Sequence, residues 1–418
     1  MESDKLLSVS EARERLLSGV EVLESETVNS ESALGRVLAE DILAPHDIPP
    51  FASSSMDGYA LQAADIAAAS ALSGVVLPVT ADIPAGPGIP QALPKGAAAR
   101  IMTGAPLPAG ADTVVPIEMT DDSARRGDIQ APQNVSVLSP VERGDYVRLA
   151  GQDMRRGEQV LTGGDYLRPQ EIGVLAAIGR RRVLVVRQPR VAILSTGDEL
   201  VDVGAKLGPG QLRDANSFML ASLVGRYGGL PTVLGIARDR NEDVEKMLDR
   251  ALDAGTDWLL SSGGVSVGAF DCVKSVVERH GEVSFWRVNM RPGKPVAFGH
   301  YKGTPFLGVP GNPVSAMASF EVFARPALQK LCGRRNLDKP SVEVTVRDEF
   351  TSDGRESYLR VVVRREEEGY VAHSVGSQDS GILTSLVRAN ALLIVPAGET
   401  HVAAGRQLTA WMLDWVQD

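Results

Sequence analysis

The stretch from Val191 to Leu200, VAILSTGDEL, is a short apolar run that ends in a small, polar, glycine-bearing turn. Two similar runs follow it, WLLSSGGVSVG at 258–268 and PFLGVPGNPVS at 305–315. A short apolar run that is followed by turn residues predicts a buried parallel strand. Ligands of open α/β sheets bind beyond the carboxyl ends of such strands, so the three turns predict one ligand crevice.

The glycines of these turns suit an anionic ligand. Gly197, Gly263, Gly264 and Gly311 let the backbone come close to a ligand. Their N–H groups can also face an anion. The crevice is therefore expected to bind a phosphate or another oxyanion.

Composition narrows the classes of protein that fit. The chain has 418 residues, which predicts several domains, and its net charge of −10 argues against general binding of nucleic acid. An anionic substrate would need a local basic patch. Cys272 and Cys332 form neither a disulfide framework nor a CxxC zinc site. The charged N-terminus is atypical of a signal peptide and no apolar run spans a bilayer, so we expect a cytoplasmic protein without membrane contact.

The distribution of Pro, Gly and apolar residues divides the chain. Ser8 and Glu11 have capping-box spacing before a first helix, and a second helix is expected over residues 30–43. Pro and Gly then recur from 49 to 147, which favours a small β domain with many turns. A helix over 168–179 with Pro169 in its first turn follows, and the pieces on either side of the β segment are expected to pack together.

The second half of the chain has two patterns. Strands and helices alternate over residues 187–331, which predicts a parallel sheet covered on both faces. Beyond Pro340 the runs VEVTVRDEF, YLRVVVRR, YVAHSV, ALLIVPAG and RQLTAWML predict a terminal β barrel or sandwich.

Acidic residues stand at the ends of several predicted strands. Asp198 and Glu199 follow Gly197, Asp239 follows PTVLGIAR, and Asp271 follows VSVGAF. Carboxylates repel phosphate unless a cation lies between them, and Mg²⁺ is the usual bridge. Each acid by itself could equally cap a helix. Taken jointly, Glu199, Asp239 and Asp271 favour a magnesium site.

A basic cluster lies in FWRVNMRPGKPVAFG, residues 285–299. It holds Arg287, Arg291 and Lys294, with Pro292 and Gly293 forcing a turn. Guanidinium groups bind tetrahedral oxyanions through paired hydrogen bonds. A solvated surface strand is the alternative. The position beside the predicted crevice favours an oxyanion pocket.

Two further segments carry only weak signals, and several catalytic motifs are absent. FASSSMDGYA, which contains Asp57, and RIMTGAPLP, which contains Thr103, each predict only a turn beside a strand. The chain has no P-loop, no GxGxxG fingerprint, no GxSxG elbow and no HExxH site. Nucleophilic hydrolysis and nicotinamide chemistry therefore lack support.

Seven motifs occur in an order that resembles a known family. SMDGYA, RIMTGAPLP, GQDMRRG, LSTGDEL, SSGGVSVG, RPGKP and VPGNPVS resemble the molybdopterin molybdenumtransferases, which include the E domain of gephyrin. The resemblance runs from about Leu7 to the C-terminal strands. It implies an elongated homodimer of an α/β multidomain chain. The implied parts are an N-terminal mixed domain (1–48 with 148–186), an inserted β domain (49–147), a parallel-sheet α/β domain like the molybdopterin adenylyltransferases (187–331) and a C-terminal β barrel (332–418).

The resemblance also implies a reaction and a set of site residues. Family members take adenylylated molybdopterin and molybdate, release AMP and yield the molybdenum cofactor with Mg²⁺ present, and the pterin could be handed over by an adenylyltransferase. The matched acids are Glu199, Asp239 and Asp271 as metal ligands, with Asp57 and Asp153 as further active-site acids. Asp57 is expected to serve the site of the partner subunit. The matched substrate-binding residues are Thr103, Gly197, Ser262, Gly263, Gly264, Arg287, Arg291, Lys294, Pro310, Asn312, Pro313, Arg360 and Ser380.

The chain departs from the family pattern in two places. Arg287 and Arg291 stand where several members have Lys, and Asp379 adds a carboxylate beside Ser380. Two other functions stay open on sequence grounds, a molybdopterin adenylyltransferase and a non-catalytic scaffold like the gephyrin domain. The basic cluster and flanking domains disfavour the first, and the retained acids disfavour the second.

Overall fold

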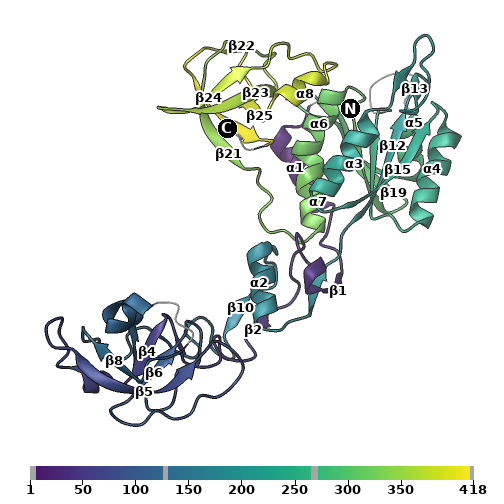
Figure 1. The fold of residues 1–418 in the computed structure, drawn as a ribbon. Coiled ribbons are helices and arrows are strands. Elements are labelled where there is room, and N and C mark those ends of the chain that lie inside the picture. Colours follow the sequence, from purple (N-terminus) through teal and green to yellow (C-terminus); the bar gives the residue numbers. More distant parts are fainter. Residues whose placement is uncertain (1–5, 126–129, 265–271, 415–418) are drawn as a thin grey trace.

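The chain forms an elongated molecule of several parts in a computed structural model that describes residues 6–125, 130–264 and 272–414. A β domain lies at one end, a slender connector follows, and an α/β domain packs against a C-terminal barrel at the other end (Figure 1). The predicted fold class is confirmed. Among the described residues, no helix is both long enough and apolar enough to cross a bilayer. Cys272 and Cys332 form no disulfide bond within the described residues.

The connector joins chain segments from both sides of the insertion, as expected. Strand β1 (Ser25–Asn29) pairs antiparallel with β11 (Arg182–Val186), and β2 (Ile42–Leu43) pairs with β10 (Gln159–Leu161). Helix α2 (Pro169–Ala177) begins at the predicted proline. The β domain is therefore an insertion between paired strands.

The predicted helix over 30–43 is wrong. The structure has only a 3-10 turn, η1 (Ser30–Ser32), before the chain becomes extended. The N–H of Leu38 donates to the carbonyl of Asp165, and that of Ala39 donates to Leu184. Gly35 also has a φ of +77°, which interrupts a helix. Backbone pairing with residues far along the chain therefore overrides the local helical pattern.

Helix α1 (Val9–Ser18) begins with the predicted capping box, in which Ser8 and Glu11 bond each other's backbone. Its buried residues Ala12 and Leu16 share a core with Phe320 and Leu328. The helix lies beside α7 (Figure 1). The start of the chain thus packs on the α/β domain rather than on the connector.

The inserted domain is a β structure, as predicted, with strand order β7-β4-β6-β5-β8. Its strands are β3 (Ser53–Ser54), β4 (Gly58–Leu61), β5 (Val75–Ile83), β6 (Ala98–Ile101), β7 (Thr113–Pro116), β8 (Asn134–Val137) and β9 (Val147–Arg148). Its 3-10 turns are η2 (Ala63–Ile66), η3 (Ile117–Met119) and η4 (Asp121–Arg125).

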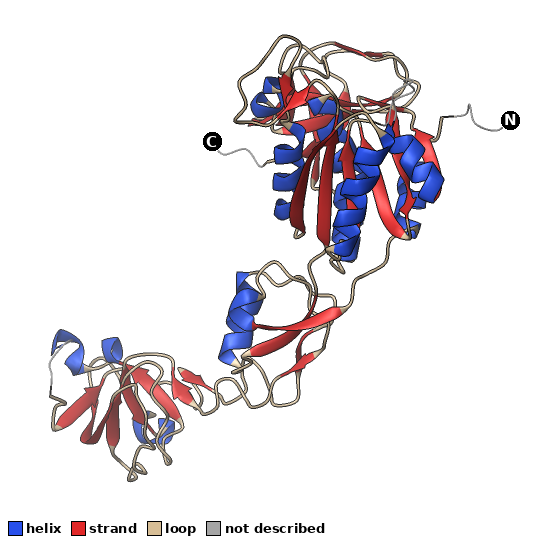
Figure 2. Cartoon of the chain, turned by 90° about the vertical axis from the view of Figure 1, so that its right-hand side faces the viewer, coloured by secondary structure: helices blue, strands red, loops and turns tan. Residues whose placement is uncertain are grey.

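The α/β domain is built on a sheet with the order β15-β12-β16-β20-β19-β17. Alternate residues of β12 face opposite cores: Val191 and Ile193 pack with α3, α6 and α7, whereas Ala192 and Leu194 pack with α4 and α5. Helices therefore cover both faces (Figure 2). The strands are β12 (Arg190–Thr196), β13 (Leu200–Val201), β14 (Leu212–Arg213), β15 (Leu230–Ala237), β16 (Trp258–Ser262), β17 (Gly281–Arg287), β19 (Pro295–Tyr301) and β20 (Thr304–Val309). The helices are α3 (Asn216–Arg226), α4 (Asn241–Asp253), α5 (Cys272–His280), α6 (Pro313–Ser319) and α7 (Arg325–Leu331).

The predicted parallel sheet contains one strand that runs in the opposite direction. Strands β15, β12, β16 and β20 are parallel, but β19 runs antiparallel to both of its neighbours, β20 and the edge strand β17. The cause is the short turn between β19 and β20, where Lys302 and Gly303 have φ values of +48° and +85°. Two successive residues with positive φ form a tight hairpin, which reverses the strand.

The C-terminal domain is a closed barrel because β23 pairs with both β24 and β25. Strand β18 (Met290–Arg291) belongs to the 187–331 segment in sequence, but it pairs with β23 of the barrel. This pairing places Arg291 opposite Ser357. One basic residue of the α/β segment is thereby fixed to the barrel. The other elements are β21 (Ser341–Val346), β22 (Phe350–Thr351), β23 (Glu356–Glu366), β24 (Gly369–Ser374), β25 (Ala391–Val395), β26 (His401–Val402), β27 (Gln407–Met412) and α8 (Thr384–Arg388).

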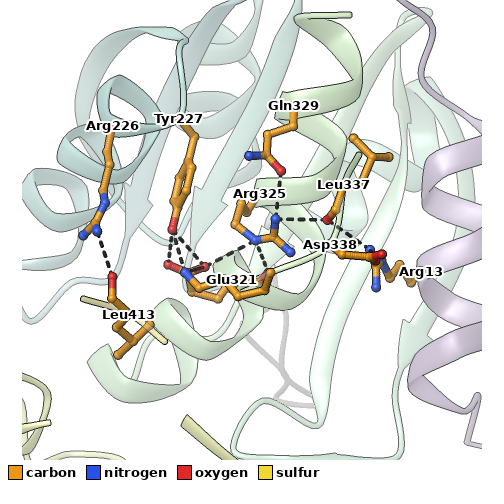
Figure 3. A network of polar contacts seen from close by, with 10 residues as sticks. Arg13, Arg226, Tyr227, Glu321, Arg325, Gln329, Leu337, Asp338 and Leu413 are labelled. Atoms are coloured by element: carbon orange, nitrogen blue, oxygen red, sulfur yellow. Dashed lines mark hydrogen bonds and ion pairs between the residues drawn. The ribbon is translucent and has the colours of Figure 1, made fainter. Parts of the chain in front are cut away.

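A buried polar cluster lies where the α/β domain leads into the barrel. Glu321, in a π-helical turn (Phe320–Ala324), accepts a hydrogen bond of 2.9 Å from the hydroxyl of Tyr227. The Arg325 guanidinium donates to Gln329 and to the carbonyl of Leu337, which lies on the connection to the barrel (Figure 3). The cluster therefore links the α/β domain to the start of the barrel through buried hydrogen bonds.

Candidate active site

The ends of β12, β16 and β20 meet, as the three turns predicted. The N–H of Gly263 donates to the carbonyl of Val309 over 3.0 Å. A Cβ atom on Gly263 would lie 2.8 Å from the carbonyl oxygen of Thr196, and Gly263 and Gly264 have φ values of +85° and +65°. Only glycine fits this close approach of strand ends without strain.

Two strand ends bring three carboxylates together. The N–H of Asp198 donates to the Asp239 carboxylate over 3.3 Å, and the N–H of Asp239 donates to Asp198 over 3.4 Å. A Cβ atom on Gly197 would lie 2.6 Å from the Glu199 carboxylate. Burial raises the pKa of Asp239, and the nearby charges of Asp198 and Glu199 raise it further.

These acids do not serve as helix caps, the alternative that the sequence left open. Glu199 is followed by strand β13 rather than by a helix. The N-cap of α4 is Arg240, and no side-chain cap bond is present there. Asp239 is therefore available to a ligand. Asp271 lies outside the described residues.

The carboxylates of Glu199 and Asp239 are candidate ligands for Mg²⁺. Within 6–125, 130–264 and 272–414, no three histidine, cysteine, aspartate or glutamate side chains form a set that could hold a metal ion. Mg²⁺, however, commonly binds one or two carboxylates and completes its shell with water and phosphate oxygens. Glu199 and Asp239 offer hard oxygen donors of that kind, so they fit an open magnesium site.

A cavity of about 370 Å³ lies between the 291–295 turn and the barrel. It brings together four predicted residues, Arg291, Lys294, Arg360 and Ser380, whereas Arg287 does not line it. The full lining is Arg291, Pro292, Gly293, Lys294, Pro295, Ser315, Arg355, Leu359, Arg360, Gln378, Asp379 and Ser380.

Arg360 is held so that one nitrogen is left for a ligand. Its Nε donates to Ser385 over 3.1 Å, and its Nη2 donates to the carbonyls of Ser377 and Asp379 over 3.1 and 3.0 Å. Nη1 has no partner in the part of the chain that the structure describes. Burial lowers the pKa of Arg360 to about 10, so the side chain is still a cation at neutral pH.

Ser380 is oriented by the loop that follows β20. Its Oγ accepts a hydrogen bond of 2.9 Å from the side-chain amide of Asn312. The serine O–H is therefore free to donate into the cavity. Asn312 is the N-cap residue of α6, which begins at Pro313, and Pro310 lies two residues earlier.

The sequence analysis missed three polar residues of this cavity, Ser315, Arg355 and Gln378. Arg355 belongs to GRESYLR, the motif that also holds Arg360, so the motif itself carried the signal. Its guanidinium bonds Asp353, with Nε 3.1 and 3.0 Å from the two carboxylate oxygens, which neutralises much of its charge. Asp379 also lines the cavity, and its carboxylate accepts a bond of 2.7 Å from the N–H of Gly381.

Asp57 and Thr103 meet each other, but in the inserted domain. The N–H and hydroxyl of Thr103 donate to Asp57 over 2.7 and 2.8 Å. This domain lies at the opposite end of the chain from the α/β domain (Figures 1 and 2). Asp153 lies in the connector, where its N–H bonds the carbonyl of Ile48. A single chain does not bring these three residues to Glu199.

Comparison with known proteins identifies the family. The chain is 39% identical over 394 residues to molybdopterin molybdenumtransferase 2 of Mycobacterium tuberculosis, covering 93% of this chain and 95% of that one. It is 33% identical to the molybdopterin molybdenumtransferase of Haemophilus influenzae, covering 97% and 98%. The chain belongs to the molybdopterin molybdenumtransferase family.

Domain models and a solved structure agree with this membership. Residues 7–179 match the MoeA N-terminal region (domain I and II), 192–330 match a probable molybdopterin binding domain, and 343–413 match the MoeA C-terminal region (domain IV). The molybdopterin biosynthesis moeA protein of Pyrococcus horikoshii OT3 superposes with a TM-score of 0.81 at 30% identity, covering 98% of this chain and 100% of that one. The molybdopterin molybdenumtransferases are transferases of molybdenum cofactor biosynthesis, and this chain is an enzyme of that family.

Proposed function

We propose that the enzyme inserts molybdenum from molybdate into adenylylated molybdopterin and releases AMP. The observation that carries this proposal is the cavity in which Arg291, Lys294, Arg360 and Ser380 converge. Within the described chain, the side chains of Arg291 and Lys294 form no hydrogen bond or ion pair, although the charge of Asp353 acts on Arg291, so both cations are available to a ligand. A tetrahedral dianion such as molybdate matches several cations and one hydroxyl donor.

Each of these groups has a distinct task. Arg291 and Lys294 neutralise the charge of the dianion, and Nη1 of Arg360 and the Ser380 hydroxyl donate hydrogen bonds that orient it. Hydrogen bonds to the protein already hold Arg360 and Ser380 in place. These donors therefore need little reorganisation during the reaction. No protein nucleophile is required, since positioning and charge neutralisation supply the acceleration.

The strand-end loops suit the nucleotide-bearing phosphates of the pterin. The N–H groups of Gly197 and Gly263 already donate to Ala237 and Val309, and these two glycines serve to let the backbone come close to the ligand. The N–H groups of Gly264 and Gly311, together with the hydroxyl of Ser262, would hold phosphate oxygens. Glu199 and Asp239, with Asp271 as a further expected ligand, would hold Mg²⁺. When bound, the ion neutralises phosphate charge and so makes AMP a better leaving group.

A homodimer would complete the site. Asp57, Thr103 and Asp153 match motifs of the family, yet one chain keeps Asp57 and Thr103 at its far end (Figure 1). In an antiparallel pair of elongated chains, the inserted domain of one subunit would reach the α/β domain of the other. We further propose a cytoplasmic location, and delivery of the pterin by a molybdopterin adenylyltransferase.

The test is steady-state release of AMP from adenylylated molybdopterin as molybdate is varied. We expect Arg291→Gln to raise the KM for molybdate by about 10-fold, because a charge-assisted hydrogen bond contributes about 1.5–3 kcal/mol. Arg365→Gln is the matched control, since Arg365 lies exposed on β23, the strand that carries Arg360. An unchanged KM in Arg291→Gln would remove the cavity from the reaction. Consumption of ATP with free molybdopterin would instead indicate an adenylyltransferase, and binding without turnover a scaffold.

A further inference from the structure

One buried side chain links two of the strand-end loops. Asn216, the first residue of α3, is only 8% exposed. Its side-chain amide donates to the hydroxyl of Ser262 and to the carbonyl of Gly311, both over 2.7 Å. Ser262 ends β16 and precedes the paired glycines, whereas Gly311 follows β20. Both protons of the amide are thus used to hold the loops together.

The loop after β20, which Asn216 holds through Gly311, is also hydrogen-bonded to the barrel. Asn312, the residue after Gly311, donates to the hydroxyl of Ser380, and the N–H of Val314 donates to the carbonyl of Ser380 over 3.2 Å. The loop after β20 therefore forms hydrogen bonds to both the hydroxyl and the backbone carbonyl of Ser380.

The barrel loop 377–380 in turn holds Arg360. The side chain of Gln378 bonds both the N–H and the carbonyl of Arg360 over 2.9 Å. Nη2 of Arg360 donates to two backbone carbonyls of the same loop. Ser380 and Arg360 are therefore held together by the 377–380 loop, and this loop is hydrogen-bonded to Asn312.

We propose that Asn216 is a positioning residue that couples the nucleotide-binding loops to the oxyanion cavity. The inference rests on the proposed function, because it assigns AMP to the loops and molybdate to the cavity. A phosphate on the Ser262–Gly264 loop orders that loop, Asn216 transmits the order to Gly311 and Asn312, and Ser380 and Arg360 are then held in the geometry that binds the dianion. Linkage requires the effect to be reciprocal, so molybdate also tightens the binding of AMP by the same factor.

The experiment is calorimetric titration of the full-length protein with molybdate, with and without saturating AMP and Mg²⁺. We expect AMP to lower the Kd for molybdate by about 5-fold or more in the unmodified protein, the lower end of typical couplings. Asn216→Ala is expected to bring that ratio close to 1 while both ligands still bind alone. Asn312→Ala is also expected to bring the ratio close to 1, but it should weaken the binding of molybdate alone as well, because Asn312 orients Ser380. Because the two residues act in series, the double variant should lose no more coupling than either single variant.

Other outcomes overturn specific claims. If the unmodified protein binds both ligands but AMP leaves the Kd for molybdate unchanged, the proposed coupling is wrong and the proposed function stands. If it binds neither ligand, the proposed function fails first. If both variants keep the full ratio, Asn216 is not the link. Asn312 is exposed, so its variant carries the test should Asn216→Ala misfold. Asn134→Ala, at an exposed position of the inserted domain, is the matched control and should keep the ratio of the unmodified protein.

Discussion

The ammonium of Lys339 lies 2.7 Å from a carboxylate oxygen of Glu321, and both side chains are at most 3% exposed. Glu321 belongs to the α/β domain, and Lys339 lies two residues before β21, the first long strand of the barrel, which begins at Ser341. Burial lowers the pKa of Lys339, and the Glu321 charge opposes that shift. The contact thus anchors the barrel at its junction with the α/β domain, beside the network of Tyr227 and Arg325 that is drawn in Figure 3.

Removing one partner of this pair should destabilise the enzyme. We expect Lys339→Met to lower the free energy of unfolding by about 3 kcal/mol, because it leaves a buried carboxylate without its main cation. Arg347→Met is the control, since Arg347 pairs with Glu366 at 2.7 Å but both side chains are about 40% exposed. That change should remove less than about 1 kcal/mol. Urea unfolding measures both, and equal losses would contradict the anchoring role.

Asp379 should weaken the binding of molybdate. Asp379 lines the cavity and its charge acts on Arg360, so it opposes the binding of a dianion. We expect Asp379→Asn to tighten molybdate binding by about 2- to 5-fold, the range that corresponds to the energies of exposed charge pairs. Asp353→Asn is a useful comparison, because it frees the guanidinium of Arg355 and should act in the same direction. Weaker binding of molybdate in Asp379→Asn would contradict this prediction. It would show that the hydrogen bond from Gly381 to the Asp379 carboxylate matters more for molybdate binding than the charge of Asp379.

Glu199 should be required for turnover but not for folding. Glu199→Gln keeps the shape of the side chain and removes its charge, so AMP release with Mg²⁺ should fall by at least about 100-fold if positioning of phosphate depends on the ion. Thermal unfolding without Mg²⁺ should change little or move upwards, because a repulsive charge is lost. Undiminished turnover would remove Glu199 from the mechanism.

Asp239 should make magnesium binding depend on pH. Its pKa is raised above the ordinary aspartate value of about 3.9, so the folded state holds this proton more tightly than the unfolded state. The contribution of this group to stability is therefore full below about pH 3.9 and is lost as the pH rises through the raised pKa. Mg²⁺ needs the ionised form, so its affinity should rise over the same interval. Melting temperatures with and without Mg²⁺ measure both trends, and Asp239→Asn should abolish both.

Much of the fold was predictable because local patterns agreed with it. Apolar runs such as Val191–Leu194 alternate between two cores, and Ser8 with Glu11 begins α1 as their spacing predicted. The helix expected over 30–43 failed because Leu38 and Ala39 bond residues more than a hundred positions away. No local pattern encodes such pairing.

The site was predictable to the extent that motifs carry glycines and charges. The sequence determined that Gly197, Gly263 and Gly264 end their strands, because all three have a positive φ that glycine adopts without strain. It also determined which cations could meet an oxyanion. Tertiary structure alone decided that β18 carries Arg291 to the barrel, that Arg287 does not line the cavity, and that Asn216 ties two loops together. The physical reason is that these relations depend on packing between segments far apart in the chain, where free energy is gained only once both partners are in place.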